Sequence, residues 1–300
     1  MSMIPVGAII AHAYRFAFEK FPAVLGVVWL PWALLCAGNY LAIGSMSTLL
    51  AAAAAQPETA LHFGSIIWLV NLLTYTMMAV QFIGVTKLAF GLPVSSRYFY
   101  FSLDKSLLRL LAAIVAIFLS MIVAVVVVIV GGALLVFLIN LLPLPVSAAT
   151  LLKALVFVVA FSAFVYFIIR LTFLITPVVV VEERIGLVRS WKLGRGNFWR
   201  MFAIFLSVVV PLVALELILI FGFLWHGLPP MPQPNATAQQ IAANQANIVA
   251  WYAASIGEIT RYWYIVYPVF LVISAIFTGL LAGAQTFAYR ALTTGAESLP

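Results

Sequence analysis

The densest group of charged and hydrogen-bonding side chains in the chain lies between residues 182 and 200. This stretch reads EERIGLVRSWKLGRGNFWR and holds five of the fifteen basic residues. Its centre, Gly194-Arg195-Gly196-Asn197, combines glycines that permit positive φ with an asparagine suited to start a helix. Free backbone N–H groups at a helix start, the helix dipole and a nearby arginine favour an anion such as a lipid phosphate. The expected chemistry is anion binding, and the candidate residues are Arg189, Lys192, Arg195, Gly196, Asn197 and Arg200.

A simpler interpretation of the same stretch is that it only fixes the orientation of a membrane protein. A helix over residues 183–193 would turn Ile185, Val188 and Trp191 to the membrane and leave the charged side chains in water or among headgroups. The two glycines would then end that helix, and the asparagine would cap the next one. In this case the basic residues attract anionic headgroups without forming a specific site.

Two ionisable residues lie inside hydrophobic stretches. Arg170 lies about ten residues, or roughly 15 Å by helical rise, from the inner end of its stretch, and Glu216 lies deeper in the next one. A charge in lipid is costly and usually paired, so we expect the two to pair across neighbouring helices. Alternatively, Glu216 is protonated, and Arg170 extends to the interface or bonds to Glu182. Interhelical hydrogen bonding is the expected role of four amides, Asn39, Asn71, Gln81 and Gln285.

The sequence offers little that could perform catalysis. It contains no nucleophile paired with a base, no phosphate-binding glycine-rich loop and no metal-ligand cluster. Only a lipid-active site built on Glu182 or Glu183 would support an enzyme. We therefore expect a protein that is not an enzyme and that needs no cofactor.

The composition identifies the solvent of this protein as lipid. Two thirds of the residues (66%) are hydrophobic, 8% are charged, and the mean hydropathy is +1.19. A soluble domain cannot hide that much apolar surface. The net charge of +7 comes from short basic clusters beside hydrophobic runs. That arrangement fits anionic phospholipid headgroups and membrane orientation, and it does not favour a nucleic-acid partner.

Six hydrophobic stretches approach the roughly 20 residues that cross about 30 Å of hydrocarbon. They predict an all-α integral membrane bundle, a single transmembrane domain over 1–300, with spans at 23–45, 64–90, 107–141, 150–180, 199–225 and 260–290. The third stretch is too long for a perpendicular crossing, so either Gly131-Gly132 breaks it or it tilts and projects. Four prolines are expected to bend their helices: Pro31, Pro177, Pro211 and Pro268.

Residues 3–21 are too polar to span a membrane. Six apolar residues can share one helical face, namely Ile9, Ile10, Ala13, Phe16, Ala17 and Phe21. This pattern predicts an amphipathic helix lying on the inner membrane surface. Tryptophan and tyrosine near the span ends are expected to form interfacial belts rather than ligand cages: Trp29, Trp32, Trp199, Trp225, Tyr262, Trp263 and Tyr264.

The distribution of basic residues predicts the orientation. With both termini inside, twelve basic residues fall in inner segments and only two, Lys153 and Arg261, in outer ones. Under the positive-inside rule this asymmetry predicts a multi-pass membrane protein with both termini cytoplasmic. The outer loops are then 46–63 and 226–259.

A weak internal repetition accompanies the six spans. The same kind of residue pair occurs just before three of the spans: an aromatic residue followed, seven positions later, by another apolar residue. The pairs are Tyr14 and Phe21, Tyr100 and Leu107, and Trp191 and Phe198. The pattern suggests three units, each an inner amphipathic helix followed by a two-span hairpin.

One run near the centre of the chain has a recognisable pattern. It comprises Arg170, Pro177, Glu182, Ser190-Trp191-Lys192-Leu193 and Gly196-Asn197-Phe198-Trp199. This run resembles bacterial polytopic proteins grouped with the membrane domain of glycerophosphoryl diester phosphodiesterases. The resemblance implies a plasma-membrane bundle linked to phospholipid metabolism. The phosphodiesterase active site would need a His-Arg pair, and none of the three histidines is followed by arginine.

Two classes of function remain. The first is a non-enzymatic, lipid-associated or accessory membrane protein, with membrane phospholipids and other protein subunits as partners. The second is a transporter or lipid translocator whose path is lined by Arg170 and Glu216. A continuous polar cavity would favour the transporter, and a filled apolar core would favour the accessory protein.

Overall fold

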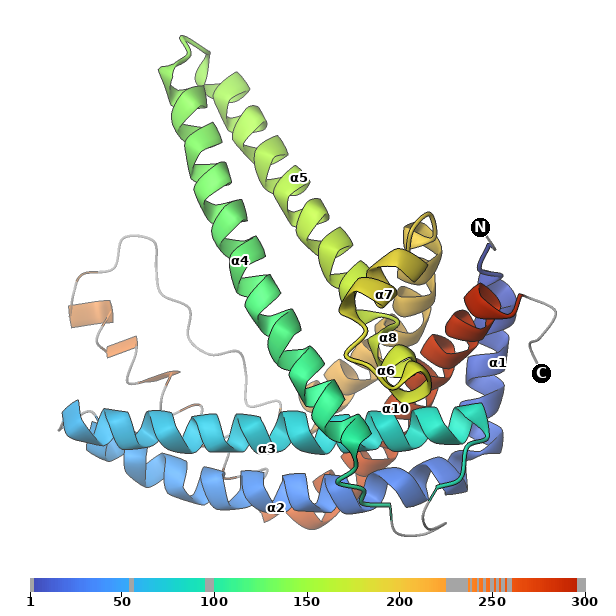
Figure 1. The fold of residues 1–300 in the computed structure, drawn as a ribbon. Coiled ribbons are helices and arrows are strands. Elements are labelled where there is room, and N and C mark those ends of the chain that lie inside the picture. Colours follow the sequence, from blue (N-terminus) through green and yellow to red (C-terminus); the bar gives the residue numbers. More distant parts are fainter. Residues whose placement is uncertain are drawn as a thin grey trace.

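The computed structural model of the chain describes residues 3–53, 57–94, 100–224 and 261–295, together with residues 237, 239–241, 243–244, 247–248, 251, 254 and 257. Its main elements are all helices (Figure 1). They are α1 (Val6–Glu19), α2 (Phe21–Ala53), α3 (Pro57–Phe90), α4 (Lys105–Leu141), α5 (Val146–Thr172), α6 (Ile175–Glu182), α7 (Leu187–Leu193), α8 (Phe198–Leu224) and α10 (Trp263–Thr293). The predicted all-α fold is confirmed.

Six segments are long and apolar enough to cross a membrane, as predicted. They are Phe21–Leu41, Trp68–Phe90, Lys105–Leu141, Val146–Glu182, Phe198–Leu219 and Trp263–Thr293. The break considered at Gly131-Gly132 is absent, because α4 continues through both glycines. Its 37 residues extend about 55 Å by helical rise. Helix α4 is therefore much longer than the hydrocarbon core is thick, which agrees with tilt or projection.

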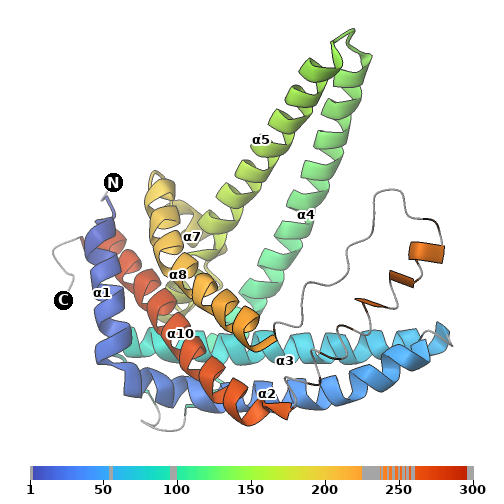
Figure 2. The ribbon, with the colours of Figure 1, turned by 180° about the vertical axis from the view of Figure 1, so that it is seen from behind.

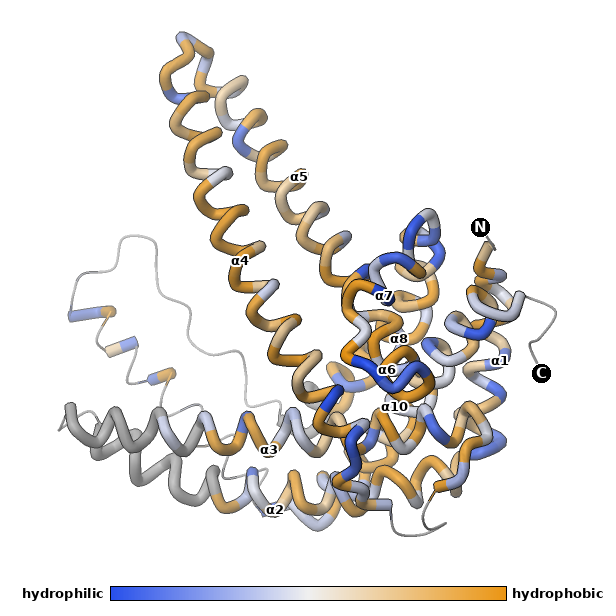
Figure 3. Tube along the Cα trace, viewed as in Figure 1, coloured by the Kyte–Doolittle hydropathy of each residue, from blue (hydrophilic) through white to orange (hydrophobic). Residues whose placement is uncertain are grey.

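The spans form three pairs. Helices α2 and α3 lie along each other, α4 and α5 form a second hairpin that rises away from them, and α8 and α10 form the third, in which α10 packs against α2 and α3 (Figures 1 and 2). Helices α1, α6 and α7 lie near the span ends that are predicted to face the cytoplasm. Hydrophilic residues gather in that region, whereas α4 and α5 are hydrophobic along almost their whole length (Figure 3).

The arrangement into three hairpins does not extend to the predicted inner helices. Helix α1 precedes the first hairpin and α7 precedes the third. Before the second hairpin, residues 100–104 are not helical. Asp104 instead caps α4 by accepting a hydrogen bond from the Leu107 N–H at 3.1 Å. The three-unit repeat thus remains a prediction.

The predicted amphipathic helix at the N-terminus is α1, and protein covers its apolar face. Ile9, Ala13 and Ala17 are at most 1% exposed, and α1 packs against α10 and α8. Two glycines of α10 permit this approach. A Cβ at Gly279 would lie 3.3 Å from the Ala17 Cβ, and one at Gly283 would lie 3.1 Å from the Phe16 Cδ1. Small residues on both helices let the backbones come close, as in other membrane helix pairs.

The predicted span 150–180 is interrupted near its inner end. Helix α5 ends at Thr172, and α6 begins at Ile175. Pro177 explains the interruption, because it lacks an N–H and its ring conflicts with a helical carbonyl at Phe173, four residues earlier. At the third position of α6, a missing N–H removes no intrahelical bond.

Residues 100–104, which precede α4, are held against α3 by burial and by an ion pair. Tyr100 is 2% exposed and lies against Gly84 of α3. Lys87 of α3 pairs with Asp104. Burial alone would raise the pKa of the Asp104 carboxyl, but bonds from the Lys87 ammonium and the Leu107 N–H hold it below its ordinary value. Helices α3 and α4 are therefore joined by packing and by charge.

Candidate functional site

The stretch 182–200, which we call the inner loop after its predicted location, contains the end of α6, a turn, α7, a second turn and the start of α8. The helix predicted over 183–193 is shorter than expected and begins at Leu187. Two residues with positive φ separate α6 from α7, Glu183 at 53° and Gly186 at 69°. A Cβ at Gly186 would come within 2.3 Å of the Val178 Cγ1, so glycine is required there by space as well as by φ.

Glu182 joins three helices within this region. Its Oε1 accepts hydrogen bonds from the Arg189 Nε at 2.9 Å and from the Tyr289 hydroxyl at 3.0 Å. Its Oε2 accepts from the Arg184 Nε at 2.8 Å. Both oxygens are thus occupied by residues of α7, α10 and the intervening turn. This carboxylate serves as a structural acceptor, and Arg189, a predicted headgroup ligand, is already paired with it.

Arg170 lies at the inner end of α5 and contacts α7. The side chain is well covered, and the residue is 8% exposed. Its Nη1 donates to the Tyr166 hydroxyl at 2.6 Å, and its Nη2 donates to the Trp191 carbonyl at 2.9 Å. The guanidinium carbon also lies 3.9 Å from the centroid of a Trp191 ring. One carbonyl, one hydroxyl and two aromatic rings therefore stabilise the charge, and no carboxylate of the described residues pairs with it.

The predicted ion pair between Arg170 and Glu216 is wrong. Glu216 lies in α8 and is partly exposed. Within the described part of the chain, no arginine or lysine forms an ion pair with it. The alternative bond from Arg170 to Glu182 is absent as well, because Arg184, Arg189 and Tyr289 surround that carboxylate. The reason is that Trp191 brings a carbonyl and an aromatic face close to Arg170, which sequence spacing could not reveal.

The turn between α7 and α8 uses only one of its two glycines for positive φ. Gly196 has φ of 78°, whereas Gly194 is in the right-handed region at −72°. A Cβ at Gly194 would lie 2.9 Å from the Met201 Cε, the flexible end of that side chain, so a small shift of the methionine would make room for it. Asn197 is 4% exposed, and its Oδ1 accepts a hydrogen bond from the Ile4 N–H at 3.2 Å. The turn therefore also fixes the start of the chain.

The remaining candidates are divided by their surroundings. Arg200 donates to the Met3 sulfur at 3.0 Å and is partly covered. Lys192 and Arg195 are exposed. Over the described residues, neither side chain has an ion-pair or hydrogen-bond partner. These two residues, with Gly196 between Arg195 and the start of α8, are the part of the predicted site that a ligand can reach.

The amide side chains within the spans behave differently from the prediction where their contacts are resolved. Asn39 donates to the Leu35 carbonyl of its own helix at 2.9 Å, so it does not join two helices by that bond. The Nε2 of Gln81 and the Oε1 of Gln285 are buried without a hydrogen-bond partner. In the part of the chain that the structure describes, no three histidine, cysteine, aspartate or glutamate residues group as a metal site.

Sequence reasoning missed three residues that organise this region. The Tyr289 hydroxyl donates to Glu182 from α10, the Tyr166 hydroxyl accepts from Arg170 within α5, and Ser190, fully buried, donates to the Leu171 carbonyl at 3.1 Å. Neither tyrosine has a local sequence signal for its role, and the run that contains Ser190 does not indicate which carbonyl it bonds. Comparison of the chain with protein-family models, curated proteins and solved structures finds no match.

Proposed function

We propose that this chain is a non-enzymatic, lipid-associated protein of the bacterial inner membrane that acts as an accessory or assembly component. Its contact with anionic phospholipid would be the exposed edge of the inner loop. One observation carries the proposal: Lys192 and Arg195 are exposed and unpaired among the described residues, at the end of the bundle where the spans meet. Gly196 lies between Arg195 and the start of α8, and its N–H also has no acceptor among the described residues.

The geometry favours a lipid headgroup as the ligand. Each basic residue close to an anionic leaflet contributes about 1 kcal/mol of attraction. The start of α8 adds backbone donors and the positive end of a helix dipole. The resemblance of the inner loop to the membrane domain of glycerophosphoryl diester phosphodiesterases supports a link to phospholipid metabolism, without the catalytic residues of that enzyme.

No specific observation favours the transporter. Arg170 is enclosed by Trp191 and Tyr166, and it does not meet Glu216. The buried side chains of the described residues are mainly apolar, and the polar exceptions include Gln81, Thr86, Gln285 and Thr286. A transporter would need a continuous polar cavity, whereas an accessory protein would have a filled apolar core. These contacts therefore support the accessory protein.

The proposed orientation predicts which exposed residues can be labelled from outside. In a Cys36→Ser background, we expect a membrane-impermeant maleimide to modify Ser147→Cys on sealed cells and to leave Arg195→Cys unmodified. Both positions are exposed, one at the α4–α5 tip and one in the inner loop, so permeabilised cells should label at both. Gln56 and Gln233, in the predicted outer loops, lie outside the described residues. Labelling of Arg195→Cys on sealed cells would contradict the orientation.

Removing the two free charges of the inner loop should weaken binding of anionic lipid. At low salt we expect Lys192→Gln with Arg195→Gln to reduce phosphatidylglycerol retention roughly thirtyfold, since two residues at about 1 kcal/mol each contribute about 2 kcal/mol. Native mass spectrometry after gentle detergent extraction measures the bound lipid.

The matched control removes two charges from the other side of the membrane. Lys153→Gln with Arg261→Gln should leave phosphatidylglycerol retention unchanged, and equal loss in both double variants would refute the site. Gly196→Val tests the turn itself, because valine is strained at φ of 78° while every charge is kept. We expect it to lower retention. If it has no effect while charge removal does, the inner loop is only a basic surface.

A further inference from the structure

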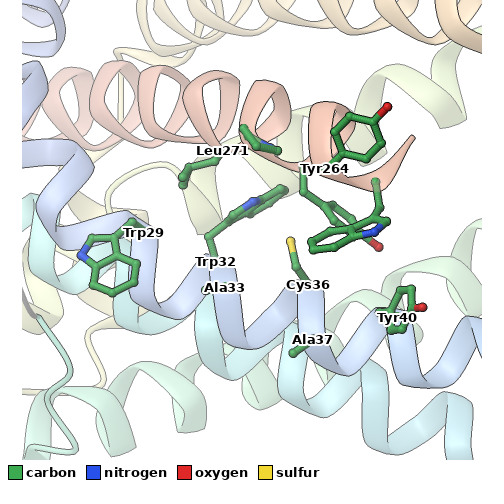
Figure 4. Close-up of a pocket in the computed structure, with 11 residues that line it drawn as sticks. Trp29, Trp32, Ala33, Cys36, Ala37, Tyr40, Tyr264 and Leu271 are labelled. Atoms are coloured by element: carbon green, nitrogen blue, oxygen red, sulfur yellow. The ribbon is translucent and has the colours of Figure 1, made fainter. Parts of the chain in front are cut away.

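A cavity of about 660 Å³ lies between α2 and α10, away from the inner loop. We call it the outer pocket. Eleven residues line it, six of them aromatic: Trp29, Trp32, Ala33, Cys36, Ala37, Tyr40, Trp263, Tyr264, Tyr267, Pro268 and Leu271. The Cys36 side chain points from α2 toward α10, beside Trp32 (Figure 4). Several of these aromatic residues were expected to lie in interfacial belts, and in the structure they surround one cavity.

The position of the outer pocket along the helices places it in the half of the bundle remote from the inner loop. On α2, its lining begins at Trp29 and ends at Tyr40, roughly 12 to 29 Å from the start of the helix by rise per residue. On α10, it occupies the first nine residues. Tyr40 and Trp263 close the far end, with ring centroids 6.4 Å apart. Such a space extends from about the middle of a 30 Å hydrocarbon core to its outer boundary.

The chemistry of the lining selects an apolar ligand. None of the eleven lining residues is charged. An ionic solute would lose its hydration there without compensation. The space is open on one side, since Tyr40 is 47% exposed and Tyr264 is 59% exposed. A ligand can therefore enter sideways from the bilayer.

The size of the outer pocket suits lipid chains. The lining runs about 16 Å along α2 by helical rise, and a hydrocarbon chain of that length, about 4.5 Å wide, fills roughly 250 Å³. The volume of about 660 Å³ is therefore enough for two such chains. This volume also falls within the roughly 300–1,000 Å³ of small-ligand sites.

We propose that the outer pocket binds the acyl chains of one outer-leaflet phospholipid. The aromatic rings provide large, rigid apolar surfaces that contact the chains. The headgroup of that lipid lies at the boundary near Tyr40 and Trp263, outside the pocket, so recognition is by the chains. This site shares no residue with the inner loop and does not depend on the proposed headgroup contact.

Filling the outer pocket tests the proposal directly. Cys36→Phe places a ring where the thiol points into the space, whereas Cys36→Ser keeps its size. The protein is extracted gently from vesicles of phosphatidylethanolamine and phosphatidylglycerol, and bound lipid is counted by native mass spectrometry. We expect Cys36→Phe to reduce the fraction of protein that carries one additional bound phospholipid by at least fivefold, for both headgroups alike. Cys36→Ser should keep that fraction unchanged. Ala112→Phe, on an exposed face of α4, should also keep it unchanged.

Three results would overturn the proposal. They are equal lipid retention in Cys36→Phe and Cys36→Ser, a loss confined to phosphatidylglycerol, and a change in oligomer mass with no change in lipid count. The second result would assign the lipid to a headgroup site, and the third would assign the pocket to a second copy of the chain. Failure of the Lys192 and Arg195 charge variants to alter retention would instead refute only the inner-loop contact.

A second measurement remains informative if Cys36→Phe does not fold. The wild-type protein is placed in vesicles containing a phospholipid with a diazirine midway along one acyl chain, and is washed in detergent before irradiation. We expect cross-links to concentrate at residues 29–40 and 263–271, at least fivefold above 115–130 of α4, which also faces lipid. An even distribution would show that only bulk lipid is present and would overturn the proposal.

Discussion

Replacing Arg170 with glutamine is expected to lower the free energy of unfolding by about 3 kcal/mol. A charged hydrogen bond contributes about 1.5–3 kcal/mol, and a desolvated cation–π contact contributes about 2 kcal/mol. Glutamine cannot stack on Trp191 and cannot reach both oxygens that Arg170 now donates to. Thermal and denaturant unfolding in detergent measures the loss. The free energy of unfolding of Arg170→Lys should lie between those of the wild type and Arg170→Gln, because lysine keeps the charge and loses the planar guanidinium.

Double-variant cycles separate this arrangement from the rejected ion pair. The effects of Arg170→Gln and Glu216→Gln should add within about 0.5 kcal/mol, because the two side chains do not interact. Arg170→Gln and Trp191→Leu should couple by about 1 kcal/mol or more, because each removes the same contact. Strong coupling of Arg170 with Glu216 would contradict the structure.

Adding a single methyl group at Gly84 is expected to have the second large effect. A Cβ at this position of α3 would lie 2.5 Å from the Val27 Cγ1 and 2.6 Å from the Tyr100 Cε1. Both neighbours are 2% exposed and have no free space to move into. Overpacking of this kind costs about 1–3 kcal/mol, and we expect Gly84→Ala to fall at the upper end. Thermal unfolding in detergent provides the measurement.

The same chain supplies a matched control for that substitution. Gly131 lies within α4, and a Cβ there would meet nothing within 4 Å. Gly131→Ala should therefore be neutral or stabilising by up to about 1 kcal/mol, through lower backbone entropy in the unfolded chain. If Gly84→Ala and Gly131→Ala change stability equally, the glycine at position 84 is not needed for close packing.

The spans could be predicted from the sequence, whereas the contacts between them could not. Hydropathy and length depend on each stretch alone, so the sequence could predict six helices long and apolar enough to span a membrane. The partner of Arg170 depends on how α5 meets α7, and nothing near Arg170 in the sequence indicates Trp191. The interruption at Phe173 agrees with the bend predicted at Pro177, because the proline acts locally.

The packing of α1 illustrates a signal that was present and not used. Gly279 and Gly283 are four residues apart in an apolar helix, a spacing that favours close helix contact. Ala13 and Ala17 show the same spacing on α1. Read together, these pairs predict that the apolar face of α1 lies against α10. The amphipathic pattern alone could not decide between lipid and protein as the cover of that face.

The divergence of the α4–α5 hairpin from α2 and α3 would affect the surrounding bilayer. In the proposed orientation, the α4–α5 hairpin leans away from α2 and α3 toward the outer side (Figures 1 and 2). Such a wedge occupies more area in the outer leaflet than in the inner one. Its insertion would expand one monolayer relative to the other and impose spontaneous curvature. Accordingly, the protein should concentrate where the membrane is already convex toward the outside.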